Sequence, residues 1–86
     1  MPPVYKEVEL RELAESFHMD LKGDPSTRIS GVNDIRAAGS SEIAFLFSDK
    51  GIDIAANSKA GALVLRPEWI DRRLENRNLL LKSGAC

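Results

Sequence analysis

The sequence of this 86-residue chain predicts a small single α/β or α+β domain, with a short mixed sheet and two or three helices. Three short apolar runs, at residues 43–47, 62–65 and 79–81, have the length and composition of buried strands. Segments 10–17, 52–60 and 67–76 instead carry apolar residues at helical spacing. Strands that alternate with helices in this way are typical of a sheet covered by helices.

The first part of the chain predicts a short strand and then a helix. Residues 1–6, with two adjacent prolines, are expected to form a loosely held lead-in. Val8 and Leu10 alternate with glutamates, as in an edge strand, and an apolar stripe from Leu10 to Phe17 then predicts a helix over about 10–17. The glutamates at positions 7, 9, 12 and 15 fit a solvated face better than acid/base chemistry.

A turn and a second strand follow. Residues 23–26, Gly-Asp-Pro-Ser, predict a turn, since the proline biases the preceding residue toward an extended conformation. Residues 28–32 predict a strand with Ile29 and Val32 as its apolar members. Gly31 within that strand indicates either a bulge or a close approach by another group.

The second half predicts strand, loop, helix, strand, helix and strand. After a small-residue turn at 37–41, residues 43–47 are apolar on both faces and are expected to form the core strand. A helix over 52–60 should end with Gly61 at its C′ position, before a strand at 62–65. Pro67 predicts the start of a helix that runs to about Asn76, and residues 79–81 predict the last strand.

Composition narrows the class of protein. A chain of 86 residues is one small domain that buries about 60% of its unfolded surface. Twelve basic and thirteen acidic side chains give a net charge of −1, too balanced to attract a nucleic-acid backbone, so no nucleic-acid partner is expected. The apolar runs are far shorter than the roughly 20 residues of a membrane span, and the start lacks a secretory signal, so a cytoplasmic protein is expected.

No metal site, cofactor or catalytic residue is predicted. His18 is the sole histidine and fits a partly exposed position at a helix end, while Cys86 is the sole cysteine and the last residue. Arg72 and Arg73 lie near acidic residues and fit ordinary surface ion pairs. The chain has no Walker loop and none of the GxGxxG, HExxH or GxSxG motifs.

The loop at 45–51 is the candidate binding site, because it follows the core strand and precedes a helix. Phe45 has a flat face for a nucleobase, Ser48 a hydroxyl for hydrogen bonding, and Lys50 a positive charge for a phosphate. An aromatic residue in a strand more often packs in the core, so these residues alone leave both roles for Phe45 open.

The order of several small motifs carries a resemblance to a known family. These are the Gly-Val pair at 31–32, Ile35, Ala37–Gly39, Ile43, Phe45–Leu46, Lys50, Ala55–Ala56, the run 59–64, the early apolar helix and the closing leucines. In this order they resemble the N-terminal nucleotide-binding domain of the UDP-3-O-acylglucosamine N-acyltransferase family of lipid A biosynthesis. The resemblance covers nearly the whole chain, although none of its motifs is diagnostic alone.

The resemblance implies that the loop at 45–51 binds uridine. In the family this loop commonly reads Phe, two apolar residues, Asn, Pro, Lys, Tyr, and its two aromatic residues hold the uracil ring between them. This chain keeps Phe45 and Lys50, but has Ser48, Asp49 and Gly51 at the Asn, Pro and Tyr positions. One ring of the pair is therefore expected to be missing, which should weaken binding roughly tenfold or more.

The resemblance further implies a UDP-sugar-binding module that is catalytically incomplete by itself. In the intact acyltransferase, an acyl carrier protein delivers the acyl chain, and hexapeptide repeats form trimers that carry the active site. This chain lacks those repeats, and His18 does not match the family's catalytic histidine. The chain is expected to be either an excised domain or a gene product reduced to that domain.

Two alternatives remain open. The N-terminal UDP-recognising domain of the Mur ligases is similar in fold and shares the Gly-Val strand, but its Asp-Ser-Arg segment is matched only in part by residues 33–36. The other alternative is a small interaction domain that has lost nucleotide binding, which Gly51 favours.

Overall fold

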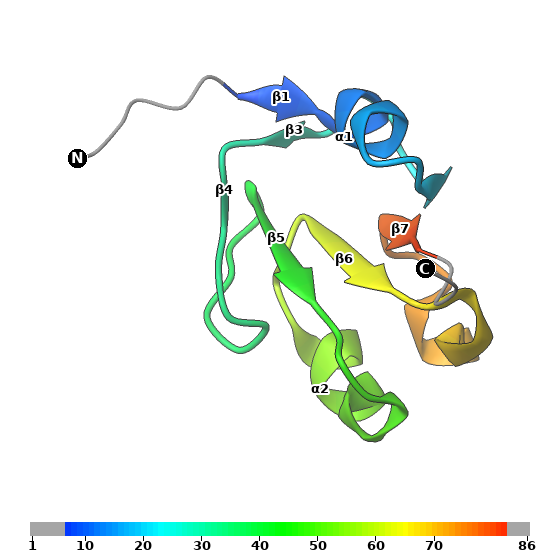
Figure 1. The fold of residues 1–86 in the computed structure, drawn as a ribbon. Coiled ribbons are helices and arrows are strands. Elements are labelled where there is room, and N and C mark those ends of the chain that lie inside the picture. Colours follow the sequence, from blue (N-terminus) through cyan, green and yellow to red (C-terminus); the bar gives the residue numbers. More distant parts are fainter. Residues whose placement is uncertain (1–6, 83–86) are drawn as a thin grey trace.

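A five-stranded mixed sheet forms the centre of the molecule, in a computed structural model that describes residues 7–82 (Figure 1). The strands run in the order β2 (Asp20–Lys22), β7 (Leu79–Leu81), β6 (Ala62–Leu65), β5 (Glu42–Phe45) and β4 (Gly31–Val32). Strands β4 to β7 are parallel, and β2 pairs antiparallel with β7. The predicted small α/β domain with a mixed sheet is therefore confirmed, while the lead-in at 1–6 and Cys86 lie outside the described residues.

Helices lie on both faces of this sheet. Helix α1 (Leu10–Ser16) follows β1 (Val8–Glu9), which pairs antiparallel with β3 (Arg28–Ile29) as a separate two-stranded sheet. Helix α2 (Ile52–Asn57) lies on the opposite side from α1 in Figure 1. The predicted helix at 10–17 is confirmed. Leu10 fitted both the strand pattern and the helix pattern in the sequence, and in the structure it is the first residue of the helix. No helix within residues 7–82 is long and apolar enough to cross a membrane.

Side chains on alternate positions of the strands form two apolar clusters. The α1-side cluster consists of Leu10, Ala14, Ile29, Ile43, Ala62, Val64 and Leu80. The α2-side cluster consists of Ala38, Ala44, Leu46, Ala55, Ala60, Leu63, Leu65, Leu74, Leu79 and Leu81. Every residue of β6 and β7 is buried, which explains why both strands are continuously apolar. The prediction of two buried strands at 62–65 and 79–81 is therefore confirmed.

The strand predicted at 28–32 is wrong as a single element. It breaks at Ser30 into β3, which pairs with β1, and β4, which pairs with β5 in the main sheet. Val32 is 66% exposed and is not a core residue. Nothing approaches Gly31 closely, because a Cβ there would lie 4.0 Å from its nearest neighbour, Glu42 Oε2. Strand β2 was not predicted, since Leu21 is its only apolar residue.

The helix predicted at 52–60 is shorter than expected. Helix α2 ends at Asn57 because Ser58 is extended, and the Ser58 Oγ accepts a hydrogen bond from the Ala60 N–H at 3.1 Å. Such local hydrogen bonds compete with helix propagation. Gly61 is therefore not the C′ residue, and a Cβ at Gly61 would overlap the backbone carbonyl oxygen of Ser40.

The helix predicted at 67–76 is also wrong. Two 3₁₀ turns, η2 (Pro67–Trp69) and η3 (Arg72–Leu74), replace it and are separated by two extended residues, Ile70 and Asp71. The Asp71 side chain accepts a hydrogen bond from Arg73 N at 2.9 Å and so caps η3. Arg73 forms ion pairs with Asp71 and with Asp53 of α2, which confirms the surface ion pairing expected for this arginine.

Asn78 connects three segments immediately before β7. Its amide nitrogen donates to Thr27 Oγ1 at 3.1 Å and to the Gly61 carbonyl at 3.0 Å, and its amide oxygen accepts from Asp24 N at 2.9 Å. The predicted turn at 23–26 is present, with Gly23 at φ +118° against Asn78. In this turn, hydrogen bonds from the Ser26 hydroxyl and N–H lower the pKa of Asp24.

We predict that Asn78→Ala lowers the free energy of unfolding by about 2 to 3 kcal/mol, because it removes three hydrogen bonds, of which those to Thr27 Oγ1 and to the Gly61 carbonyl are partly buried. Urea unfolding followed by circular dichroism measures the change. The matched control is Asn76→Ala at an exposed position nearby, expected to cost at most about 0.5 kcal/mol. Equal effects of the two substitutions would contradict the role of Asn78.

We further predict that Gly61→Ala is destabilising by about 1 to 3 kcal/mol, because the added methyl group overlaps the Ser40 carbonyl, a backbone atom that cannot rotate away. Gly31→Ala is the control, since its Cβ has ordinary space. Thermal unfolding of both variants checks the difference. A Gly61→Ala protein as stable as the Gly31→Ala protein would show that the two backbones do not approach this closely.

Candidate functional site

The connector at 45–51 lies at the carboxyl end of β5, between that strand and α2 (Figure 1). Its neighbours β4 and β6 run parallel to β5, so the carboxyl ends of these strands share one edge of the sheet. A short 3₁₀ turn, η1 (Asp49–Gly51), completes the connector and leads directly into α2. Open α/β sheets commonly bind ligands at this edge.

Phe45 is the last residue of β5 and is 42% exposed. It pairs with Val64 in β6, and strand alternation directs its side chain to the α1 side, as for Ile43. The α1-side cluster contains Ile43 and Val64 but does not contain Phe45. The expectation that residues 43–47 are buried on both faces is therefore wrong at this position, where the Phe45 side chain is partly exposed.

Phe47 lies beside Phe45 and was not among the site residues predicted from the sequence. Its ring is 84% exposed and stacks on the Phe45 ring, with 5.9 Å between the ring centroids and 9° between the ring planes. The intervening Leu46 is buried in the α2-side cluster, so the chain is still alternating here. The spacing of two phenylalanines two residues apart in an extended segment was the available signal.

Ser48 and Lys50 are linked through the backbone of the connector. The Ser48 Oγ accepts a hydrogen bond from Lys50 N at 3.1 Å, and the Gly51 N–H donates to the Ser48 carbonyl at 3.1 Å. Ser48 is thus the N-cap of η1, a position that favours serine. The Lys50 side chain is exposed, and Lys50 is the only basic residue of the connector.

Gly51 occupies the position where the resemblance expects an aromatic residue. Its φ of −90° requires no glycine. A Cβ at this position would lie 2.7 Å from Leu46 Cδ1, which belongs to the α2-side cluster. A side chain at position 51 would therefore first contact the end of the flexible Leu46 side chain.

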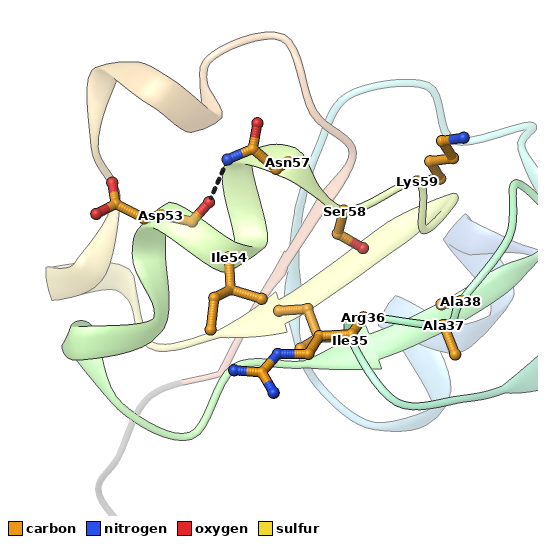
Figure 2. Close-up of a pocket in the computed structure, with 9 residues that line it drawn as sticks. All are labelled: Ile35, Arg36, Ala37, Ala38, Asp53, Ile54, Asn57, Ser58 and Lys59. Carbon is orange, nitrogen blue, oxygen red and sulfur yellow. Dashed lines mark hydrogen bonds between the residues drawn. The ribbon is translucent and has the colours of Figure 1, made fainter.

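A separate groove of about 470 Å³ lies between α2 and the loop after β4 (Figure 2). It is lined by Ile35, Arg36, Ala37, Ala38, Asp53, Ile54, Asn57, Ser58 and Lys59. Two of its polar side chains bond to the backbone, since Asn57 Nδ2 donates to the Asp53 carbonyl at 2.9 Å and Ser58 Oγ accepts from the Ala60 N–H at 3.1 Å, and the Asp53 carboxylate pairs with Arg73. In Figure 2 the Arg36 and Lys59 side chains point in different directions, so their charges do not converge on one point.

The groove contains none of the predicted site residues Phe45, Ser48 and Lys50. A ligand site usually combines an apolar surface with a few convergent polar groups. The connector at 45–51 offers aromatic faces, a hydroxyl and a cation from one short segment. It is therefore the stronger candidate for ligand binding.

The acidic and histidine side chains do not form a metal centre in the part of the chain that the structure describes. Between residues 7 and 82, no group of three His, Cys, Asp or Glu side chains could hold a metal ion. His18 is exposed directly after α1, at φ 55°, which agrees with the helix-end position expected for it.

Comparison with known proteins finds curated relatives, although no family model matches the chain. A UDP-3-O-acylglucosamine N-acyltransferase from Chlamydia pneumoniae is 43% identical over 84 residues, which cover 96% of this chain and 22% of that protein. The protein of the same name from Lawsonia intracellularis is 37% identical over 70 residues, or 81% of this chain and 19% of its own length.

A third such acyltransferase, from Oleidesulfovibrio alaskensis, is 37% identical over 62 residues, covering 72% of this chain and 18% of that protein. The chain thus spans about a fifth of the length of these curated relatives. Nearly all of it is similar to part of a UDP-3-O-acylglucosamine N-acyltransferase.

Proposed function

We propose that this chain is the UDP-sugar-binding domain of a UDP-3-O-acylglucosamine N-acyltransferase, with Phe45, Ser48 and Lys50 binding the nucleotide. The observation that carries the proposal is that the Phe45 ring, at the carboxyl end of β5, is partly exposed. A fully buried ring at this position would have no surface on which a base could stack. The 43% identity to an enzyme named for a UDP-sugar supports the class of ligand.

Each residue has a distinct part in binding. Phe45 stacks against the uracil ring, and such stacking contributes about 1 to 3 kcal/mol per base in nucleic-acid complexes. The Ser48 oxygen already accepts the Lys50 N–H, so its hydroxyl hydrogen donates to a uracil carbonyl. Lys50 places its ammonium group against the diphosphate.

In the intact enzyme, this domain holds the UDP-sugar while an acyl carrier protein delivers the acyl chain. The transfer itself takes place in the repeat-containing part, within a cytoplasmic trimer. The 86-residue chain alone binds the nucleotide sugar without turnover. The Mur-ligase alternative gains no support from the relatives described above, which are acyltransferases by name.

The second candidate function is an interaction domain without nucleotide binding. The glycine at position 51, where the resemblance expects the second aromatic residue, is the observation in its favour. Titration with UDP distinguishes the two functions, because only the binding domain gives saturable changes at residues 45–51.

We predict that UDP and UDP-N-acetylglucosamine shift the amide resonances of residues 45–51 saturably, and that Phe45→Ala weakens binding by about 5-fold to 100-fold. Two-dimensional NMR of the purified chain measures both effects. Phe17→Ala is the matched control, since Phe17 is 61% exposed at the end of α1 and lies outside the connector. Saturable shifts confined to the groove, at residues 35–38 and 53–59, would place the site elsewhere. No shift at millimolar UDP would overturn the proposed function.

We also predict that Lys50→Gln weakens UDP binding about threefold and leaves uridine binding unchanged, because the ammonium group acts on the phosphates through a solvent-screened attraction. Calorimetric titrations with UDP and uridine at low and high salt measure the difference. Lys59→Gln, on the groove, is the control. A Lys50→Gln protein that loses uridine and UDP affinity equally would contradict a phosphate-binding role.

A further inference from the structure

We infer that Phe47 supplies the second ring against which the uracil base stacks, in place of the aromatic residue expected at position 51. This inference rests on the proposed function, because it names a further residue of the same binding site. It rests on the exposed Phe47 ring, which lies parallel to Phe45, and on the glycine at position 51, which has no side chain to stack on a base.

The two rings already have the required orientation. The planes of Phe45 and Phe47 differ by only 9°, and their centroids lie 5.9 Å apart. Because Phe47 is 84% exposed, much of its apolar surface contacts water in the free protein. A planar base that covers this surface gains both apolar burial and stacking.

Position 51 does not provide a ring on this side of β5. A Cβ at Gly51 meets Leu46 Cδ1 at 2.7 Å, and Leu46 belongs to the α2-side cluster. Strand alternation directs Phe45 and Phe47 to the other side. Position 51 is moreover a glycine, so it has no side chain that could stack on a base.

A base enters between the rings through a small movement of Phe47. Stacked bases are spaced by about 3.4 Å, so a base between two rings needs about 7 Å between their planes. Phe45 belongs to β5 and pairs with Val64 of β6, which keeps its backbone in place. Phe47 lies beyond the end of β5 and is exposed, so a change of its side-chain torsions provides the space.

The experiment compares Phe47→Ala, Phe47→Leu and Phe47→Tyr in the full 86-residue chain, with uridine and UDP as probes. We expect Phe47→Ala and Phe47→Leu to weaken both ligands at least about fivefold, because leucine keeps apolar surface but has no ring face. Phe47→Tyr should remain within about twofold of the original chain. The upfield shift of the uracil H5 and H6 protons, caused by the flanking rings, should decrease in the alanine and leucine variants.

Phe17→Ala serves again as the control for the loss of an exposed phenylalanine, and the amide spectrum of each variant verifies the fold. If Phe45→Ala loses binding while Phe47→Ala binds as the original chain does, the inference about Phe47 is wrong and the proposed function stands. Tighter binding by Phe47→Ala would also overturn the inference, since Phe47 would then only cover Phe45. If the original chain binds neither uridine nor UDP, both fail.

Discussion

The burial of β6 on both faces is the constraint on which the rest of the structure depends. All four of its residues are buried, with Ala62 and Val64 in the α1-side cluster and Leu63 and Leu65 in the α2-side cluster. The parallel neighbours β5 and β7 are aligned by their hydrogen bonds to this strand. The carboxyl ends of these strands are therefore held at one edge, and the connector after β5 begins from a rigid position.

The two phenylalanines of this connector contrast with the rest of the sheet. A small domain buries a smaller fraction of the surface of its unfolded chain than a large domain does. Each apolar side chain left exposed therefore removes a larger part of the burial that stabilises the fold. Here the closing leucines 79–81 are buried. Phe45, by contrast, is partly exposed, Phe47 is largely exposed, and the two rings stack on each other. An exposed pair of parallel rings at the carboxyl edge of a parallel sheet is an apolar surface of the kind that binds partners or ligands.

How much of the fold the sequence predicts depends on how strongly burial determines each element. Strands 62–65 and 79–81 are correct to the residue, because both of their faces are buried and no polar residue interrupts them. The helix at 67–76 fails because Pro67 starts a 3₁₀ turn as readily as an α-helix, and the Asp71 cap then starts a second turn. The contact between Gly61 and Ser40 joins segments far apart in sequence, which local patterns do not reveal.

The candidate site stays a prediction, and the structure shows which of its side chains are exposed. Residues Phe45, Ser48 and Lys50 follow from the order of motifs, whereas Phe47 was assigned to the core because its run is uniformly apolar. The structure gives the departures at 48 and 51 a common physical reason. Ser48 caps the η1 turn, and this turn brings Gly51 against Leu46, where a side chain would not fit without displacing that leucine. Because position 51 is a glycine, it supplies no ring to a base, whereas Phe47 is exposed and lies parallel to Phe45.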